Sequence, residues 1–510
     1  MAAFITRRVL ISLFILLGAS FIMYILTTLA GDPLENLRTA GGANREALIE
    51  QRTAALMLNV PAPLRFFLWL GGAAKCLVPM ANSCDLGVNI AGQQVTELLG
   101  RAMGSTIQLI VVAVILAIIV GITTGIVSAM RQHTAFDNGM TFISFLLYSL
   151  PSFWVAILLK QFFAIGYNDF LREPVIPPLW IVAISIVSGL IWQTLVMGNR
   201  HRRLIVFGGS GVVTAIVLTY FSLSGWFLRP GLGPVIIAAG SIGIALAVVA
   251  LTAGLRDRSA MLTAGIIVVV TVACYFALQG LLDISSVATV VILAIVTLVV
   301  GLGVGLLVRG PDRRLYMRIG AATAVLSASL ILVDRLMRSW PIYSDQVGGR
   351  PIGTIGSQTP GLSGDIWVHG VDSFSHLLLP TLTLMLISFA SYTRYSRSGM
   401  LDVLNQDYIR TARAKGLPER VVILRHAFRN SLIPIATLIA SEFGSLLGGA
   451  IITEQVFAFS GMGALFQTGI NTVDPNPVMG YFVVIAVMTI VFNFLADMSY
   501  SALDPRVRTR

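Results

Sequence analysis

The chain has 510 residues, of which 56% are hydrophobic and only 12% are charged, and its mean hydropathy is +0.85. Repeated apolar runs of about twenty residues place it among multi-pass membrane proteins and leave no room for a large soluble domain. The 35 Lys and Arg outnumber the 24 Asp and Glu, but the excess falls in short loops between apolar runs. This distribution indicates membrane topology and argues against nucleic-acid binding.

Windows of about twenty residues predict an all-α fold with about twelve membrane spans. The first run is expected to be a retained span, because it is long and no small-residue cleavage site follows it. The basic loops alternate so that both termini are expected on the cytoplasmic side. The predicted spans lie near residues 9–29, 103–129, 139–166, 178–198, 204–223, 233–254, 260–281, 285–308, 317–336, 377–398, 432–452 and 478–499.

The predicted spans fall into three stretches that differ in composition and in the length of their loops. Residues 1–176 are expected to form one half of a core, with an outer loop at 30–102, and residues 337–510 the other half. Residues 177–336 are nearly pure apolar runs with very short turns, and we interpret them as an inserted block of six spans with a structural role. The glycines of VVGLGVGLLVRG lie inside a span, so they indicate close helix contact rather than a phosphate loop.

The motifs of common enzymes are missing from the sequence. It has no G-x-x-x-x-G-K-S/T, no H-E-x-x-H and no G-x-S-x-G, and its five histidines do not have metal-ligand spacing. We therefore expect no catalytic residue and no metal site. Cys76 and Cys84 share one polar outer loop, where they form either a disulfide or two free thiols, whereas Cys274 lies in an apolar run.

Three ionisable residues lie within predicted spans, where a buried charge is costly and often functional. For Lys160 and Asp497 we favour pairing or snorkelling at a helix end. Glu442 lies about ten residues into its span. It is either a hydrogen-bonding residue between helices or part of a transport path.

The densest basic stretch, YIRTARAKGLPERVVILRHAFRNSLIP, covers residues 408–434 between two apolar runs. Asp407 as a cap, Gly416 as a helix end and Pro418 as a first helical residue predict two short helices joined by a tight turn. Such short helices are marginal alone, so the pair is either a solvated inner loop or docks on a protein surface. Three apolar residues share one face of the second helix: Val421, Leu424 and Phe428.

The stretches YIRTARAKGL and RHAFRNSLIP resemble the cytoplasmic EAA loop of permease subunits in the dipeptide/oligopeptide branch of ABC importers. Of the general EAA pattern only Ala412 and Gly416 are kept, and the departures look like those of the peptide branch. The block 177–336 departs from the six-span core of that family. Further motifs follow in the family's order: AGDP (30–33), YSLPSFW (148–154), HLLLPTLTL (376–384), GGAIITEQVFAFSGMG (448–463) and ALDPRVR (502–508).

The resemblance implies a type I importer core and a non-catalytic permease subunit for di- or oligopeptides in a bacterial cytoplasmic membrane. It implies as partners a second homologous permease, two ATPase subunits or domains, an extracytoplasmic binding protein and membrane lipid. ATP and Mg would bind the ATPases, so this chain would hold no cofactor. Nickel, glutathione or haem are alternative cargoes. A proton-coupled secondary transporter with twelve spans is the rival class.

In this interpretation residues 402–431 form the coupling loop that docks in a groove of an ATPase. Apolar side chains would supply contact area, Gly416 the turn, and basic side chains charge complementarity. No substrate-path residue is assigned beyond the candidate Glu442. The implied coupling residues are Arg410, Ala412, Arg413, Lys415, Gly416, Arg420, Val421, Leu424, Arg425 and Phe428.

Overall fold

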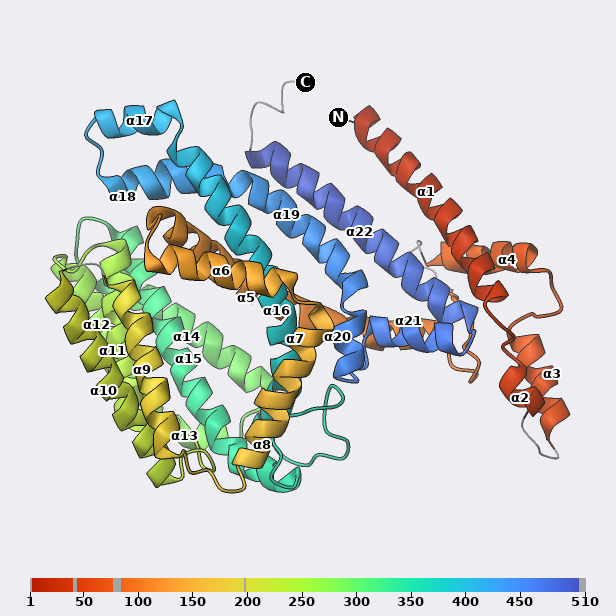
Figure 1. The fold of residues 1–510 in the computed structure, drawn as a ribbon, viewed down its shortest axis with the longest axis horizontal. Coiled ribbons are helices and arrows are strands. Elements are labelled where there is room, and N and C mark those ends of the chain that lie inside the picture. Colours follow the sequence, from red (N-terminus) through yellow and green to blue (C-terminus); the bar gives the residue numbers. More distant parts are fainter. Residues whose placement is uncertain (1, 40–43, 77–83, 197–198, 504–510) are drawn as a thin grey trace. The chain divides into compact units, whose positions relative to one another are not determined.

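A computed structural model describes residues 2–39, 44–76, 84–196 and 199–503 (Figure 1). Within these ranges the chain is almost entirely helical, and the one extended pairing is an isolated bridge between Val88 and Gln94. The chain divides into two compact units. Unit 1 comprises Met1–Phe163, Thr354–Ser357 and Leu377–Arg510, and unit 2 comprises Ala164–Gly353 and Gln358–His376.

Ten described helices are long and apolar enough to cross a membrane, and one bent pair brings the number to eleven. The all-α, multi-pass class is therefore confirmed, but the number of twelve is not. The predicted span at 432–452 falls on α19 (Phe428–Gly449), which is helical but is not among these candidates. The closing motif at 502–508 lies largely outside the described residues.

Unit 1 is built from two sets of helices that are distant in sequence. α16 begins in unit 2 and continues through unit 1. The first set is α1 (Ala2–Leu29), α2 (Glu35–Thr39), α3 (Arg45–Ala55), α4 (Ala62–Lys75), α5 (Val95–Met130), α6 (Ala135–Ser149) and α7 (Ser152–Leu159). The second is α16 (Ile366–Leu404), α17 (Asp407–Ala414), α18 (Glu419–Val421), η2 (Val422–Ala427), α19, α20 (Ile451–Val456), α21 (Met462–Asn471) and α22 (Pro475–Leu503).

Unit 2 contains the whole predicted block 177–336 and extends beyond it on both sides; the block's boundaries stay a prediction. Side chains of Asp257, Ser286 and Asp312 accept backbone N–H groups at the starts of three of its helices, α12, α14 and α15. The π-helical segment η1 (Lys160–Ile165) leads into the unit. Its helices are α8 (Gly166–Phe170), α9 (Pro178–Leu195), α10 (Arg200–Ser224), α11 (Gly233–Thr252), α12 (Arg258–Ala277), α13 (Gln279–Asp283), α14 (Val287–Leu307) and α15 (Arg313–Gln346).

The predicted span at 139–166 is wrong as a single helix. α6 and the helical stretch Ser152–Phe170 meet at an angle of 104°. Pro151 causes the break, since it disfavours helical backbone at the residue before it, and Leu150 is indeed extended. The YSLPSFW motif therefore marks a corner rather than the middle of a span.

The segment after the two cysteines is tied to the start of α22. A disulfide joins Cys76 and Cys84. The carboxylate of Asp474 accepts the Ile90 N–H at 2.7 Å, and the Asn476 amide donates to Val88 O at 2.7 Å. The segment 84–94 is thus held by side chains nearly four hundred residues away.

Candidate functional site

The basic stretch forms the predicted helix and tight turn. α17 ends at Ala414, and Gly416 has a φ of 73°, in the left-handed region. The Leu417 N–H bonds Ala412 O at 3.4 Å and the Gly416 N–H bonds Arg413 O at 2.9 Å. These two bonds define a Schellman motif, which explains why a glycine stands at this position. Figure 1 shows α17 and α18 folded back at one end of α16 and α19.

Both predicted caps are displaced by one residue. Gln406 precedes α17 and makes no side-chain cap, so Asp407 is the first helical residue and is almost fully exposed. Pro418 precedes the second helix rather than beginning it. An acidic residue in the first turn still complements the helix dipole, because exposed N–H groups carry positive partial charge there.

The second helix is not a separate short helix, so that prediction is wrong. The backbone is helical from Glu419 through the π-turn η2 into α19 and on to Gly449. Pro434 lies inside α19, where it leaves one backbone carbonyl without its usual partner. The basic stretch is therefore continuous, through helix, with α19.

The π-turn also changes which face is buried. Val422 and Ala427 are fully buried, whereas the predicted docking residue Leu424 is 56% exposed. The predicted face assumed 3.6 residues per turn, and a π-turn takes more residues per turn, so the register slips. The other two predicted residues of that face, Val421 and Phe428, are half-buried.

One apolar cluster seats the basic stretch on two long helices of unit 1. It joins Ile409 and Ala412 of α17 and the two buried η2 residues to Ala129 of α5 and Met400 of α16. Ala412 is therefore a residue of this chain's own core and is not free for a partner. A displacement of α17 must pass to the ends of α5 and α16, because close-packed side chains transmit strain.

The outward surface of the stretch combines apolar and basic groups. Tyr408, Leu417 and Leu424 are 42%, 38% and 56% exposed. Of the predicted coupling cations, Lys415 and Arg425 are also exposed, and the side chain of Arg420 lies outside the described residues. This mixture of exposed apolar groups and cations is suited to an acidic protein surface with apolar pockets. We define this outward surface as the α17–η2 surface: Tyr408, Arg410, Lys415, Leu417, Leu424 and Arg425.

Two other predicted cations already have partners within the basic stretch or next to it. Arg413 holds Glu419 through two hydrogen bonds of 2.7 and 3.2 Å, which clamp α17 to α18 across the turn. These bonds lower the pKa of Glu419 and raise that of Arg413. Arg410 lies 3.6 Å from Asp407 and is largely exposed. Arg413 therefore fixes the turn, whereas Arg410 remains accessible.

A buried ion pair near this cluster was not predicted from the sequence. Arg397 of α16 binds the carboxylate of Asp137 in α6 at 2.7 and 2.9 Å. Ser128 Oγ and the His133 N–H donate to the same carboxylate at 2.5 and 3.0 Å. The only sequence signal was an acid three residues after the capping Thr134, and it gave no hint of a partner 260 residues away.

A cavity of about 260 Å³ borders this ion pair. Three hydroxyls that contribute to its wall, those of Thr141, Ser144 and Thr393, have no hydrogen-bond partner among the described residues. Such groups favour a polar occupant. The lining residues are Thr141, Ser144, Phe145, Thr393, Arg394, Arg397, Ser398, Leu401 and Asp402.

A second buried carboxyl lies in the motif at 448–463. Glu454 is fully buried, and it accepts hydrogen bonds from Thr106 Oγ1 at 2.7 Å and the Ala464 N–H at 3.0 Å. A Cβ at Gly461 would lie 2.3 Å from its Oε1, so only glycine fits there. Burial raises the pKa of Glu454. In the sequence, the one indication of this contact was that Glu454 lies seven residues before Gly461.

The ionisable residues predicted inside spans have different surroundings. Lys160 donates to Val456 O at 2.8 Å, at the last residue of α20, which is the helix-end pairing we predicted. Glu442 is half-buried in α19, within electrostatic range of the Tyr392 hydroxyl. The side chain of Asp497 lies outside the described residues. Among the described residues no cluster could hold a metal ion.

The fold thus defines an all-helical, multi-pass membrane protein with a helical element seated on the ends of its long helices. Residues 284–509 match the family described as "Binding-protein-dependent transport system inner membrane component". The predicted resemblance to peptide permeases of ABC importers is confirmed. The match begins inside the block predicted at 177–336.

Curated relatives agree with this family. The oligopeptide transport system permease protein OppB of Mycobacterium tuberculosis is 42% identical over 181 residues, which cover 36% of this chain and 54% of that protein. AppB of Bacillus subtilis, also an oligopeptide transport system permease protein, is 44% identical over 136 residues (27% and 43%). The dipeptide transport system permease protein DppB of Escherichia coli is 42% identical over 138 residues (27% and 41%). The chain spans about half the length of the relatives it matches.

Proposed function

We propose that the chain is a permease subunit of an ATP-driven ABC importer for di- or oligopeptides. It would lie in a bacterial cytoplasmic membrane with both termini inside, and it would itself catalyse no reaction. Its partners would be a homologous permease, two ATPase subunits or domains and an extracytoplasmic binding protein. The family match and the relatives' names support this class and this cargo.

The coupling role is supported by one observation: one side of the basic stretch is buried and the other side is exposed. Its inner side, with Val422 and Ala427, is buried on α5 and α16, while Leu424 and Leu417 face outward among cations. An ATPase bound to the α17–η2 surface would move α17. That movement would pass through the buried cluster to the ends of α5 and α16, and through Arg397 to α6, as rigid-body motion.

Site-specific photo-crosslinking tests this proposal. With p-benzoyl-phenylalanine at position 424 in the assembled complex, we expect a covalent adduct with an ATPase subunit. The matched control is position 132, where Gln132 is also exposed and lies in the predicted inner turn between α5 and α6. Strong adducts at 424 and weak ones at 132 support the coupling role. Equal yields, or no ATPase adduct at 424, would show that this surface is not the contact.

We further propose that the polar cavity beside Arg397 lies on the peptide path, because unpartnered hydroxyls can bond a peptide backbone without selecting its side chains. Ser144→Phe, which fills the cavity, should reduce uptake of labelled peptides at least tenfold while leaving the complex assembled. Gly139→Ala on the same helix, where a Cβ meets no atom within 4 Å, is the control. Undiminished uptake by Ser144→Phe would remove the cavity from the path. Competition of peptide uptake by nickel, glutathione or haem distinguishes the cargo classes.

A further inference from the structure

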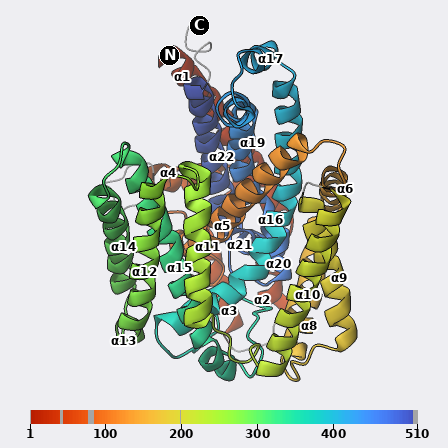
Figure 2. The ribbon, with the colours of Figure 1, turned by 90° about the vertical axis from the view of Figure 1, so that its left-hand side faces the viewer.

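Unit 2 contains an apolar groove that the proposed import function does not use. It lies between α12 and α14, which are side by side in Figure 2, with α15 completing the wall. Its volume is about 210 Å³. The wall includes Leu278, Leu282, Val290, Ala294, Val300 and Ser329.

One end of the groove is closed by glycines. The α14 lining stops at Val300, one residue before Gly301, where α14 and α15 touch backbone to backbone. A Cβ at Gly301 would lie 2.7 Å from Gly320 O, and one at Gly305 would lie 2.4 Å from Tyr316 O. These contacts confirm the close helix contact predicted for the glycine stretch. The space between the helices therefore narrows toward Gly301.

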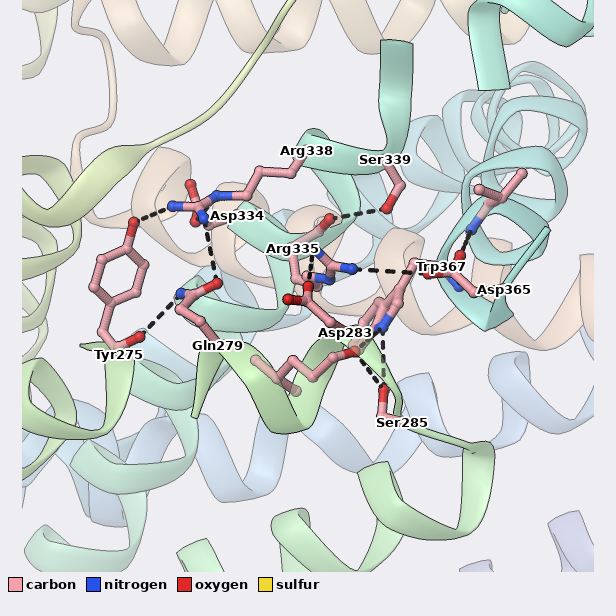
Figure 3. A network of polar contacts seen from close by, with 12 residues as sticks. Tyr275, Gln279, Asp283, Ser285, Asp334, Arg335, Arg338, Ser339, Asp365 and Trp367 are labelled. Carbon is pink, nitrogen blue, oxygen red and sulfur yellow. Dashed lines mark hydrogen bonds and ion pairs between the residues drawn. The ribbon is translucent and has the colours of Figure 1, made fainter. Parts of the chain in front are cut away.

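The opposite end of the groove lies beside a polar network (Figure 3). The lining residue Leu278 precedes α13 and Leu282 lies within it, and Gln279 of α13 accepts a hydrogen bond from Arg338 at 3.2 Å. Arg338 also pairs with buried Asp334 at 2.9 Å. The charged members number two cations and three acids, so the network offers no net attraction to an anion. They are Arg335, Arg338, Asp283, Asp334 and Asp365.

The interior of the groove has few side chains that could form hydrogen bonds with water. Thr271, Thr297 and Ser329 are the hydroxyl-bearing side chains of its wall, and the Ser329 hydroxyl already donates to Val325 O of its own helix at 2.9 Å. A buried water needs two or more polar partners. The helices α12, α14 and α15 all have the length and apolarity of membrane spans, so we expect hydrocarbon around the groove.

We propose that this groove binds one acyl chain of a membrane lipid, with the methyl end toward Gly301 and the headgroup end toward α13. The α14 lining, from Val290 to Val300, extends about 15 Å along the helix axis, a length that suits a linear chain. A helix of a partner or of a second copy is uniformly about 10 Å wide, and a space that tapers to helix contact does not admit it. The network, in which acids outnumber cations by one, predicts no preference for anionic lipids.

Photo-crosslinking with the full-length chain in lipid nanodiscs tests the proposal. The probe is phosphatidylcholine carrying a diazirine near the end of one acyl chain, and adducts are located by mass spectrometry. We expect adducts on Val296 and Val300, which line the groove and are 49% and 38% exposed, at least fivefold above those on Val269 and Phe276, which do not line it and are 69% and 63% exposed. Moving the diazirine toward the headgroup should move the adducts toward Leu278. Phosphatidylglycerol should label the same residues to within twofold.

Filling the groove supplies a competition control. Ala294→Trp places a large side chain in the groove and should abolish the enrichment, whereas Val299→Trp, on the exposed face of the same helix, should leave it unchanged. Adducts spread evenly over groove and outward residues, or crosslinks to a second copy of the chain, would overturn the proposal. A several-fold preference for phosphatidylglycerol would overturn the headgroup assignment. If Ala294→Trp fails to fold, the positions of the lipid adducts on the unsubstituted chain still test the proposal.

Discussion

Arg397 and Asp137 join two long helices, α16 and α6, through a pair of hydrogen bonds of 2.7 and 2.9 Å in which the carboxylate is almost completely buried. Arg413 and Glu419 form a pair of similar geometry whose two side chains are 43% and 55% exposed. The two pairs lie in the same region of unit 1. They differ in solvation and in the additional hydrogen bonds that Asp137 accepts from Ser128 and His133.

We predict that Asp137→Ala destabilises the protein by about 3 kcal/mol, because it leaves a guanidinium without its partner beside a buried cluster. Glu419→Ala should cost about 0.5 kcal/mol, since exposed pairs contribute little. Thermal unfolding in detergent, followed by a thiol-independent fluorescence signal, gives both values. Equal shifts in melting temperature would show that burial of Asp137 does not set the strength of its pair.

Replacement of Gly416 should act through backbone conformation alone. Its φ is 73°, and a Cβ there would meet no atom within 4 Å, so there is space for a side chain but strain in the backbone. Gly416→Val should cost about 1–2 kcal/mol, whereas Gly416→Asn should cost much less because Asn adopts the left-handed region readily. In proteoliposomes containing the full complex, we expect uptake per ATP hydrolysed to fall several-fold for Val and to remain near normal for Asn. Normal coupling in Gly416→Val would mean that the Schellman turn is not needed for transmission.

We predict that substitution of Glu454 strongly destabilises the protein, although Glu454 is not part of the α17–η2 surface. Glu454→Ala removes the acceptor for Thr106 Oγ1 and the Ala464 N–H and leaves a cavity, so we expect a loss of about 3 kcal/mol. Glu454→Gln keeps one acceptor oxygen and should lose about half as much. Chemical denaturation of the purified chain measures both, with the exposed Glu419→Gln as a control. A neutral Ala variant would exclude Glu454 as a structural centre.

The attachment of residues 84–94 to Asp474 should weaken as the pH rises. Burial raises the pKa of Asp474 from 3.8 to about 6, so the folded state holds a proton that the unfolded state has released. The stabilisation is complete below pH 3.8 and is lost as the pH passes 6, with an upper limit of about 3 kcal/mol. Hydrogen exchange of amides 85–94, corrected for intrinsic rates, should show less protection at pH 7.5 than at pH 5. Asp474→Asn should abolish the difference, and if the difference persists in that variant another group is responsible.

Much of the architecture could be predicted from patterns within single segments. Apolar runs of about twenty residues predicted the spans, because each must satisfy its backbone in hydrocarbon without help from elsewhere. Gly416 predicted the turn because a left-handed backbone conformation is a local requirement that glycine meets most easily. The close contact of α14 and α15 was also visible, as three glycines at small spacing.

The parts that sequence reasoning missed depend on partners far apart in the chain. No local pattern links Asp137 to Arg397 or Glu454 to Thr106, because these pairs form only when distant helices meet. The exposure of side chains in the basic stretch depends on distant contacts as well. The π-turn at 422–427 shifts the helical register, and Val422 and Ala427 are buried against α5 and α16. Segment length and charge thus settled the class of this protein, whereas tertiary contacts decided which side chains of the basic stretch are buried and which are exposed.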